Sequence, residues 1–442
     1  MSSLEVTIEK LVHGGDGLAR LPDGKVIFVP ETIPGERVQV EIRQKFKDYA
    51  LARVKRVLLP SPTRKDPPCV YFPACGGCQL QHIEYKAQLD YKLAVFKETL
   101  SRIGEIPLEV LENCLPSPEA LGYRHRLQFH VHQGTGALGF LKRRSHDLVP
   151  LKRCLLARPE INEVLERLPH VAAWKRLHPY VTRVNLGVSL AEKKVCMLFW
   201  TQVPPRREDL EEIRASLPVL KAIFYWVRGR EPEGPFPQEA PHRGRRLFPV
   251  PPEVSGLQEE AFFFAAPGVF VQANWEVNLA LISAVKLYAR PEKGLPILDL
   301  HSGMGNFLLP LGVVSRVGLG VDTDHRAIAD ARYNQRKWGL SGLSFEVSSA
   351  LEALLNFLKE GERFPVVLLD PPRGGCKELL RFLPDLVEER LIYISCDPPT
   401  LARDLNILLK SGFDLELLKP FDMFPQTFHL ESLALLRRQS SP

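Results

Sequence analysis

Long apolar runs are missing from this 442-residue sequence, and their absence excludes several classes of protein. No stretch of about 18 consecutive apolar residues occurs, so no membrane-spanning helix is expected. The N-terminal residues Met1–Thr7 contain no apolar signal core, which predicts a cytoplasmic protein rather than a secreted one. Internal repeats and low-complexity segments are missing too, so neither a repeat architecture nor a disordered chain is expected.

Cysteine is scarce, with 8 residues in the whole chain, and a disulfide framework is not expected in a cytoplasmic protein of this length. Three of them nevertheless lie close together, at Cys69, Cys75 and Cys78. This spacing is typical of a metal ion or a metal cluster, whose fourth ligand must come from elsewhere in the chain. Four thiolates suit either zinc or a [4Fe–4S] cluster, and the spacing alone does not distinguish the two.

Positive charge is only slightly in excess, and the net charge is +6. Such a balance permits a nucleic-acid partner without establishing one, and a soluble enzyme with a small-molecule substrate explains it equally well. The basic residues do gather in clusters, at 124–126, 142–144 and 243–246.

The length predicts two or three domains. In residues 1–58, short alternating apolar runs are separated by the turn signals Gly14–Gly17 and Pro22–Gly24, which predicts a five-stranded OB-like barrel. Barrels of this kind often bind oligonucleotides. A proline-rich linker follows.

The middle of the chain divides into two parts. Residues 59–82 and 120–262 are expected to form a strand-rich central domain of mixed α+β type. Residues 83–119 are expected to form a helical segment that packs on the C-terminal domain. Its helix, Ile83–Ile103, has apolar residues at helical spacing on one face.

Residues 263–442 alternate apolar strands with helices, as doubly wound parallel sheets do. The whole chain is therefore predicted to be a multidomain α/β protein. The expected buried strands of this last domain are 296–300, 317–321, 366–370 and 391–396.

A glycine turn after the first of these strands predicts a nucleoside site. Gly303 and Gly305 follow Asp299, and the next strand ends in Asp322, about 20 residues further on, where an acidic residue can bind ribose hydroxyls. Leu308 stands where a dinucleotide fingerprint has its third glycine, so S-adenosylmethionine fits better than NAD.

Cys396 ends another buried strand, beside the predicted donor site, and we interpret it as a nucleophile. C5 of uracil attacks a methyl group only after a thiolate has added to C6, and a base must later remove the C5 proton. Arg373 follows Asp370-Pro371-Pro372 where enzymes that methylate amino groups have an aromatic residue. Cys376 is the competing nucleophile.

Taken together, these motifs resemble the class I RNA (uracil-5-)-methyltransferases, in the form that has a TRAM domain and an iron–sulfur cluster. The resemblance covers nearly the whole chain and rests on the segments 270–274, 299–307, 370–374, 395–404 and 422–427. It implies an N-terminal TRAM barrel, a central iron–sulfur domain and a C-terminal Rossmann-like methyltransferase domain.

The resemblance also implies the roles of individual residues. Cys396 would be the nucleophile and Glu431 the base. If the last strand, 432–436, is antiparallel, Glu431 begins it at the same sheet edge as Cys396. Four residues match positions that bind S-adenosylmethionine: Gln272, Asn306, Asp322 and Asp370. His301 and Ser349 fall at further such positions but are unusual residues there, and Cys154 matches the fourth ligand of a [4Fe–4S] cluster.

The implied partner is RNA, ribosomal RNA rather than transfer RNA, and a monomer without membrane contact is expected. Two alternatives stay open: a cytosine-C5 RNA methyltransferase and a non-catalytic RNA-binding protein. The sequence departs from the family at Asp397, where the family has Asn. A charge beside Cys396 disfavours the thiolate unless it is paired or points away.

Overall fold

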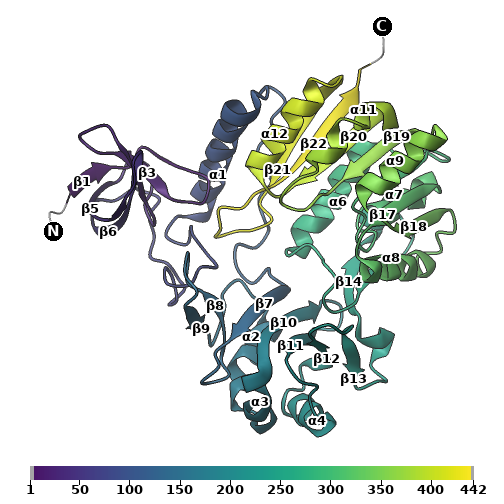
Figure 1. Ribbon diagram of the computed structural model, residues 1–442, viewed down its shortest axis with the longest axis horizontal. Helices are drawn as coiled ribbons and strands as arrows, with labels where there is room; N and C mark the ends of the chain where they lie inside the picture. The colour runs from purple at the N-terminus through teal and green to yellow at the C-terminus, as the bar shows by residue number, and fades with distance from the viewer. Residues whose placement is uncertain (1–3, 440–442) are drawn as a thin grey trace.

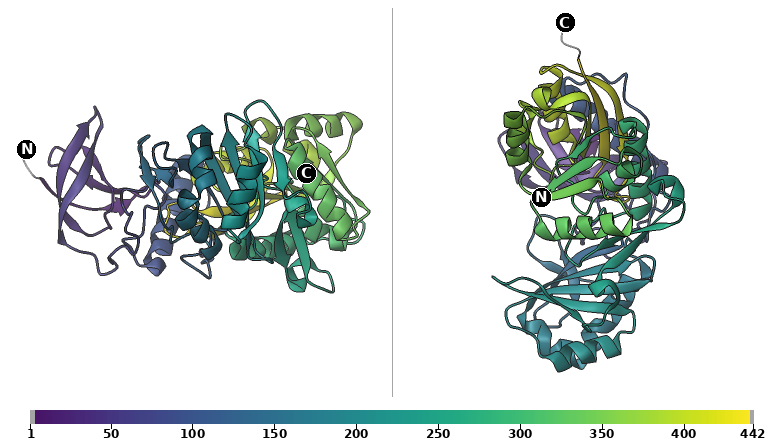
Figure 2. Two further views of the ribbon diagram at one scale, coloured as in Figure 1. Left: turned by 90° about the horizontal axis from the view of Figure 1, so that it is seen from below. Right: turned by 90° about the vertical axis from the view of Figure 1, so that its right-hand side faces the viewer.

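The computed structural model describes residues 4–439 and shows three lobes (Figure 1). An N-terminal barrel lies at one end of the long axis and a C-terminal α/β lobe at the other. Figure 2 shows that most of the barrel projects to one side, whereas the central and C-terminal lobes are stacked on one another. The barrel still contacts the rest of the molecule, for example through the ion pair of Lys10 with Glu98. In this described part of the chain, no helix is long and apolar enough to cross a membrane.

The barrel contains six strands rather than the five expected. One of them, the second along the chain, is only two residues long and is easily missed in a sequence pattern. The alternating pattern buries Ile27, Val38 and Val40 completely inside it. The sheet order is β1-β5-β6-β4-β3-β2. Its strands are β1 (Leu4–Thr7), β2 (Lys10–Leu11), β3 (Gly17–Arg20), β4 (Val26–Val29), β5 (Arg37–Lys45) and β6 (Tyr49–Leu59).

Helix α1 (Tyr85–Thr99) continues into a π-helical turn, Leu100–Gly104. The expected apolar face is only partly correct. Phe96 and Leu100 are buried, but Ile103 is 49% exposed. The other deeply buried side chains of this helix are polar, Gln88 and Lys92, because both find partners in a loop far along the sequence.

The segment after α1 runs along the edge of the C-terminal sheet. Leu111 and Leu115 form parallel bridges with Leu418 and Phe421. Phe96, Leu100 and Ile106 also share one core with that sheet. Residues 83–119 therefore lie against the C-terminal domain.

The central lobe is built on a seven-stranded sheet of order β13-β12-β11-β10-β7-β8-β9, with helices packed on it. Trp174 and Phe199 are fully buried in its core. Its elements are β7 (Arg126–Val131), β8 (Leu138–Leu141), β9 (Leu148–Pro150), α2 (Pro159–Arg167), α3 (Ala172–Leu177), β10 (Val181–Ser189), β11 (Lys194–Thr201), α4 (Arg207–Ser216), β12 (Leu220–Val227) and β13 (Glu233–Phe236).

The expected domain boundary at 262–263 falls inside a strand. β14 (Arg246–Val250) and β15 (Ala261–Ala265) form an antiparallel pair, joined through the short helix α5 (Pro252–Ser255). Phe248 and Phe263 share a core with Trp275 of the C-terminal domain. This pair therefore packs with the C-terminal lobe.

The C-terminal sheet has the order β18-β17-β16-β19-β20-β22-β21. The four expected strands are confirmed, as β16 (Ile297–Asp299), β17 (Gly318–Asp322), β19 (Phe364–Leu369) and β20 (Val387–Ser395). They are parallel, and β22 (Glu431–Arg438) is antiparallel to β20, as expected. The remaining elements are α6 (Trp275–Ala289), α7 (Leu308–Ser315), α8 (His325–Lys337), β18 (Leu343–Val347), α9 (Ala350–Glu360), α10 (Lys377–Leu380), α11 (Leu383–Leu386), α12 (Pro398–Leu409) and β21 (Phe413–Phe421).

Candidate active site

The carboxyl ends of the parallel strands gather the candidate residues at one edge of the C-terminal sheet. Asp299 and Asp322 end β16 and β17, and Asp370 directly follows β19. Cys396 directly follows β20, whose last residue, Ser395, pairs with Ser432 of the antiparallel β22. Ligands bind at this edge in open α/β sheets, so donor, nucleophile and base positions share the expected place.

The turn after β16 is shaped to approach a ligand closely. Gly303 and Gly305 have φ angles of 53° and 88°, which favour glycine. The Gly303 amide donates to Asp322 Oδ2 at 2.9 Å, and the Asp324 amide donates to Oδ1 at 2.8 Å. Asp322 thus braces the turn from the neighbouring strand.

Several buried polar atoms of this turn have no hydrogen-bond partner among residues 4–439: Asp299 Oδ2, His301 Nδ1 and Ser302 Oγ. Burial raises the pKa of Asp299 to about 8, and burial together with Asp322 raises the pKa of Asp370 to about 7. A cluster of acids that repel one another beside unpaired polar atoms suits a ligand with positive charge and hydroxyl groups. S-adenosylmethionine carries both, so the residues fit this donor.

The other expected donor residues are placed less directly. Gln272 Nε2 donates to Asp370 Oδ2 at 3.4 Å, so Gln272 lies at the same sheet edge as Asp370. The side-chain amides of Asn306 and Asn278 bond each other reciprocally, at 2.9 and 3.0 Å. The Ser349 hydroxyl accepts the Glu352 amide at the start of α9, which already explains that serine as a helix cap.

Electrostatics link Cys396 to Glu431. Burial and the neighbouring Glu431 raise the pKa of Cys396 to about 11, and Arg373 counteracts the shift. Glu431 is only 2% exposed, and burial together with Asp370 raises its pKa well above the ordinary value, again against Arg373. Arg373 is therefore a cation that favours both the thiolate and the carboxylate.

The Asp397 carboxylate has a hydrogen bond and a nearby imidazole, but its charge still contributes to the raised pKa of Cys396. Its Oδ2 accepts the Thr400 amide at 3.1 Å and so caps helix α12. Its Oδ1 lies 3.9 Å from Nε2 of His13, which belongs to the barrel. His13 had no sequence signal of its own, because only the packing of the barrel against the catalytic domain brings it here.

Cys376, the competing candidate nucleophile, is buried. It is 2% exposed, and its Sγ donates to the Tyr393 hydroxyl at 3.6 Å. Burial raises its pKa to about 12. Cys396 is the more exposed of the two and lies at the ligand-binding edge.

The four clustered cysteines line one cavity of about 240 Å³, together with Arg124, Phe140 and others. Gly76 lets the cysteine loop approach β8, because a Cβ there would lie 2.7 Å from the Leu141 carbonyl oxygen. In residues 4–439, no group of three Cys, His, Asp or Glu side chains is arranged to hold a metal ion. The four expected cysteines therefore line a common cavity but are not arranged around a single metal position.

Comparisons with known proteins place the chain in a family. Residues 253–439 match the model of the tRNA (Uracil-5-)-methyltransferase family, and residues 2–55 match the TRAM domain. The chain is 34% identical to the 23S rRNA (uracil(1939)-C(5))-methyltransferase of Thiobacillus denitrificans, over 98% of this chain and 99% of that one. The chain belongs to the RNA (uracil-5-)-methyltransferase family.

One further relative and one solved structure are also similar to this chain. An RNA methyltransferase of Aquifex aeolicus is also 34% identical, over 98% of both chains. The Pyrococcus abyssi tRNA (uracil-54, C5)-methyltransferase, solved with S-adenosyl-L-homocysteine, has a TM-score of 0.73 at 24% identity, over 98% of this chain and 100% of that chain. That structure supports the fold. As a family member, the protein is an S-adenosylmethionine-dependent enzyme that methylates uracil C5 in RNA.

Proposed function

We propose that this methyltransferase modifies a uridine of 23S ribosomal RNA and does so through a covalent bond between Cys396 Sγ and C6 of the uracil. The ribosomal substrate is supported by the full-length similarity to the Thiobacillus denitrificans enzyme. The observation that carries the mechanism is the pairing of Ser395 with Ser432, since it puts Cys396 and Glu431 at adjoining strand ends.

The proposed steps follow from this arrangement. The Cys396 thiolate adds to C6, and the C5–C6 π electrons move into the ring as an enolate. C5 then attacks the methyl group of the donor, and S-adenosylhomocysteine leaves with the C–S electron pair. Finally Glu431 takes the C5 proton, the C5=C6 bond re-forms and the thiolate is expelled. The raised pKa of Glu431 makes its carboxylate a stronger base for this last step.

Donor binding prepares the nucleophile. In the free site, Asp370 is one of the acids that raise the pKa of the Cys396 thiol. A sulfonium cation held beside Asp370 would offset that negative charge and favour the thiolate. We infer that Gln272, Asp322 and Asp370, with the turn around His301 and Asn306, hold the donor. Ser349 would contribute only indirectly, by capping helix α9.

We further propose that Cys69, Cys75, Cys78 and Cys154 hold a [4Fe–4S] cluster. A single zinc ion needs four ligands about 2.0–2.3 Å from one point, whereas a cluster spreads its thiolates around a larger body. The cavity that these cysteines line supports the second arrangement. Such a cluster can transfer electrons, but none are needed for methyl transfer, so we assign it a structural role. We also expect the enzyme to act as a monomer.

The test of the function is nucleoside analysis. The protein is incubated with methyl-labelled S-adenosylmethionine and, separately, with deproteinised 23S rRNA and with total tRNA, and the RNA is digested to nucleosides. Labelled 5-methyluridine from the ribosomal RNA alone is the expected result. Label in 5-methylcytidine, or in tRNA only, would contradict the proposal, and no label in either RNA would favour a non-catalytic binding protein.

A further inference from the structure

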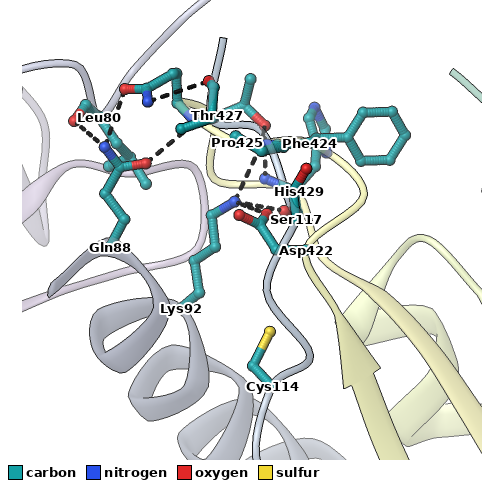
Figure 3. Close-up of polar contacts among 12 residues, drawn as sticks. Leu80, Gln88, Lys92, Cys114, Ser117, Asp422, Phe424, Pro425, Thr427 and His429 are labelled. Atoms are coloured by element: carbon teal, nitrogen blue, oxygen red, sulfur yellow. Dashed lines mark hydrogen bonds and ion pairs between the residues drawn. The ribbon is translucent and has the colours of Figure 1, made fainter. Parts of the chain in front are cut away.

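Side chains of helix α1 hydrogen-bond the loop that precedes Glu431. Residues 422–430 connect β21 to β22, and Phe421 pairs directly with Glu431 across the strands that the loop joins. Because Glu431 is the first residue of β22, its position depends on how this loop is held. Figure 3 shows the loop and α1 side by side, with Lys92 pointing into the loop.

Lys92 uses all three of its ammonium hydrogens on this loop. Its Nζ lies 2.6 Å from Asp422 Oδ1, 3.0 Å from the Phe424 carbonyl oxygen and 3.1 Å from the His429 carbonyl oxygen. An ammonium group has three donors and no acceptor, so this set is complete. Lys92 thereby ties the first residue of the loop to a residue two positions before Glu431.

Gln88, one helical turn earlier, holds the loop tip. Its Nε2 donates to Gln426 Oε1 at 3.0 Å, and its Oε1 accepts the Gln426 amide at 3.1 Å. Gln426 has a φ angle of 69°, a conformation that needs support in a residue with a side chain. The two polar side chains on the buried face of α1 therefore hold the loop at four residues, Asp422, Phe424, Gln426 and His429.

Stability alone does not account for this pair of charges. The side chains of Lys92 and Asp422 are 2% and 0% exposed. Buried ion pairs can often be replaced by uncharged groups of similar volume without loss of stability, since desolvation offsets their attraction. What an apolar pair could not do is bond the carbonyl oxygens of Phe424 and His429.

We propose that Lys92, assisted by Gln88, is a positioning residue that keeps the Glu431 carboxyl group within reach of the C5 proton. This inference rests on the function proposed above, in which Glu431 acts only in the last step. Cys396 lies between β20 and α12, outside the loop, so its own position does not depend on Lys92. Moving Glu431 away would remove one of the charges that raise the pKa of Cys396, so addition and methyl transfer should not slow, whereas proton removal should.

The test compares two steps in a single turnover. The RNA carries tritium at C5 of its uridines, and the donor carries a labelled methyl group, so methyl transfer and proton release are followed separately. The variant Lys92→Met/Asp422→Asn removes both charges and leaves no unpaired buried ion. We expect methyl transfer close to that of the parent, tritium release slowed about 10- to 100-fold, and a methylated protein–RNA adduct on a denaturing gel.

Two reference variants make the result decisive. Arg437→Met/Glu416→Gln removes an exposed ion pair of 2.6 Å from the far end of the same hairpin and should behave like the parent. Glu431→Gln should accumulate the adduct. If Glu431→Gln does so but the Lys92→Met/Asp422→Asn variant slows both steps equally, or neither, the positioning role is wrong and the mechanism stands. If Glu431→Gln itself turns over normally, the mechanism fails, and the positioning role fails with it.

Discussion

Ser395 and Ser432 face each other across the antiparallel ladder of β20 and β22. This single pair of the register brings the residue after Ser395, which is Cys396, to the residue before Ser432, which is Glu431. The spacing between Cys396 and Glu431 in the sequence does not by itself indicate that the two residues are close. Catalysis therefore depends on groups that meet at this sheet edge or support it.

The covalent mechanism predicts which variants trap an adduct. Glu431→Gln keeps the size of the side chain but removes its basicity, so turnover should fall about 10²- to 10⁴-fold while a methylated protein–RNA adduct accumulates. Cys396→Ala should form no adduct, alone or combined with Glu431→Gln. Denaturing gels with labelled donor measure both. Cys376→Ala is the matched control and should behave like the parent, since that thiol is buried against Tyr393.

Donor binding should release protons near neutral pH. The pKa values of Asp299 and Asp370 are raised to about 8 and about 7, with burial as the main cause in both. A bound cation favours the ionised carboxylates, so S-adenosylmethionine should bind more tightly as pH rises from about 6 to about 8. The heat of donor binding should be measured by titration calorimetry in two buffers of different ionisation enthalpy. Because the buffer takes up the released protons, the two heats should differ, and Asp299→Asn should reduce the difference. Equal heats for the parent would show that these acids do not change their protonation.

Much of the architecture could be predicted because local patterns determine it. The apolar strands before Asp299 and Asp370 are buried at all positions but Pro365, and short apolar runs between glycine turns define both the nucleoside turn and the barrel. The antiparallel β22 was expected from the family resemblance rather than from the pattern of residues, since an apolar run does not reveal its direction.

What could not be predicted depends on contacts between distant segments. Lys92 lies on the same helix face as Phe96. The spacing of apolar residues along the helix does not predict that a lysine is buried there. Its partner Asp422 is 330 positions away. Similarly, His13 meets Asp397 only because the barrel packs on the catalytic domain. Such long-range polar pairs leave no local signature in a single sequence.

Asp397 offers a way to shift the titration of the nucleophile. It is one of the acids that raise the pKa of Cys396, although burial is the largest cause. Asp397→Asn keeps a good helix cap for α12 but removes the charge, so the pKa of Cys396 should fall. In the Glu431→Gln background, the pH profile of adduct formation should move to lower pH. A shift to higher pH, or none, would show that the charge of Asp397 does not raise the pKa of the nucleophile.

The cysteine cavity predicts a metal content. Protein purified without oxygen should be brown and contain about four iron and four sulfide ions per chain. Cys154→Ala should lose them, whereas Cys196→Ala, a buried cysteine outside the cavity, should keep them. A colourless protein with about one zinc ion per chain would contradict the cluster.

The barrel should contribute to RNA affinity through its charge. Lys45, Lys47 and Lys55 are exposed on β5, β6 and the turn between them. Where a lysine neutralises a phosphate, binding releases counterions, and the logarithm of the affinity falls linearly with the logarithm of salt concentration. Replacing all three with glutamine should weaken RNA binding and flatten that slope, by about 0.7 for each phosphate of single-stranded RNA that is no longer neutralised.

Two measurements separate this effect of the three lysines from a general effect of charge. Donor affinity of the triple variant should equal that of the parent, since the three lysines belong to the barrel and the proposed donor residues belong to the C-terminal domain. Lys359→Gln, on the exposed side of α9, is the matched control and should leave the salt dependence of RNA binding unchanged. Filter binding across several salt concentrations measures the slopes. Equal slopes for the triple variant and the parent would mean that these lysines do not touch the phosphates of the RNA.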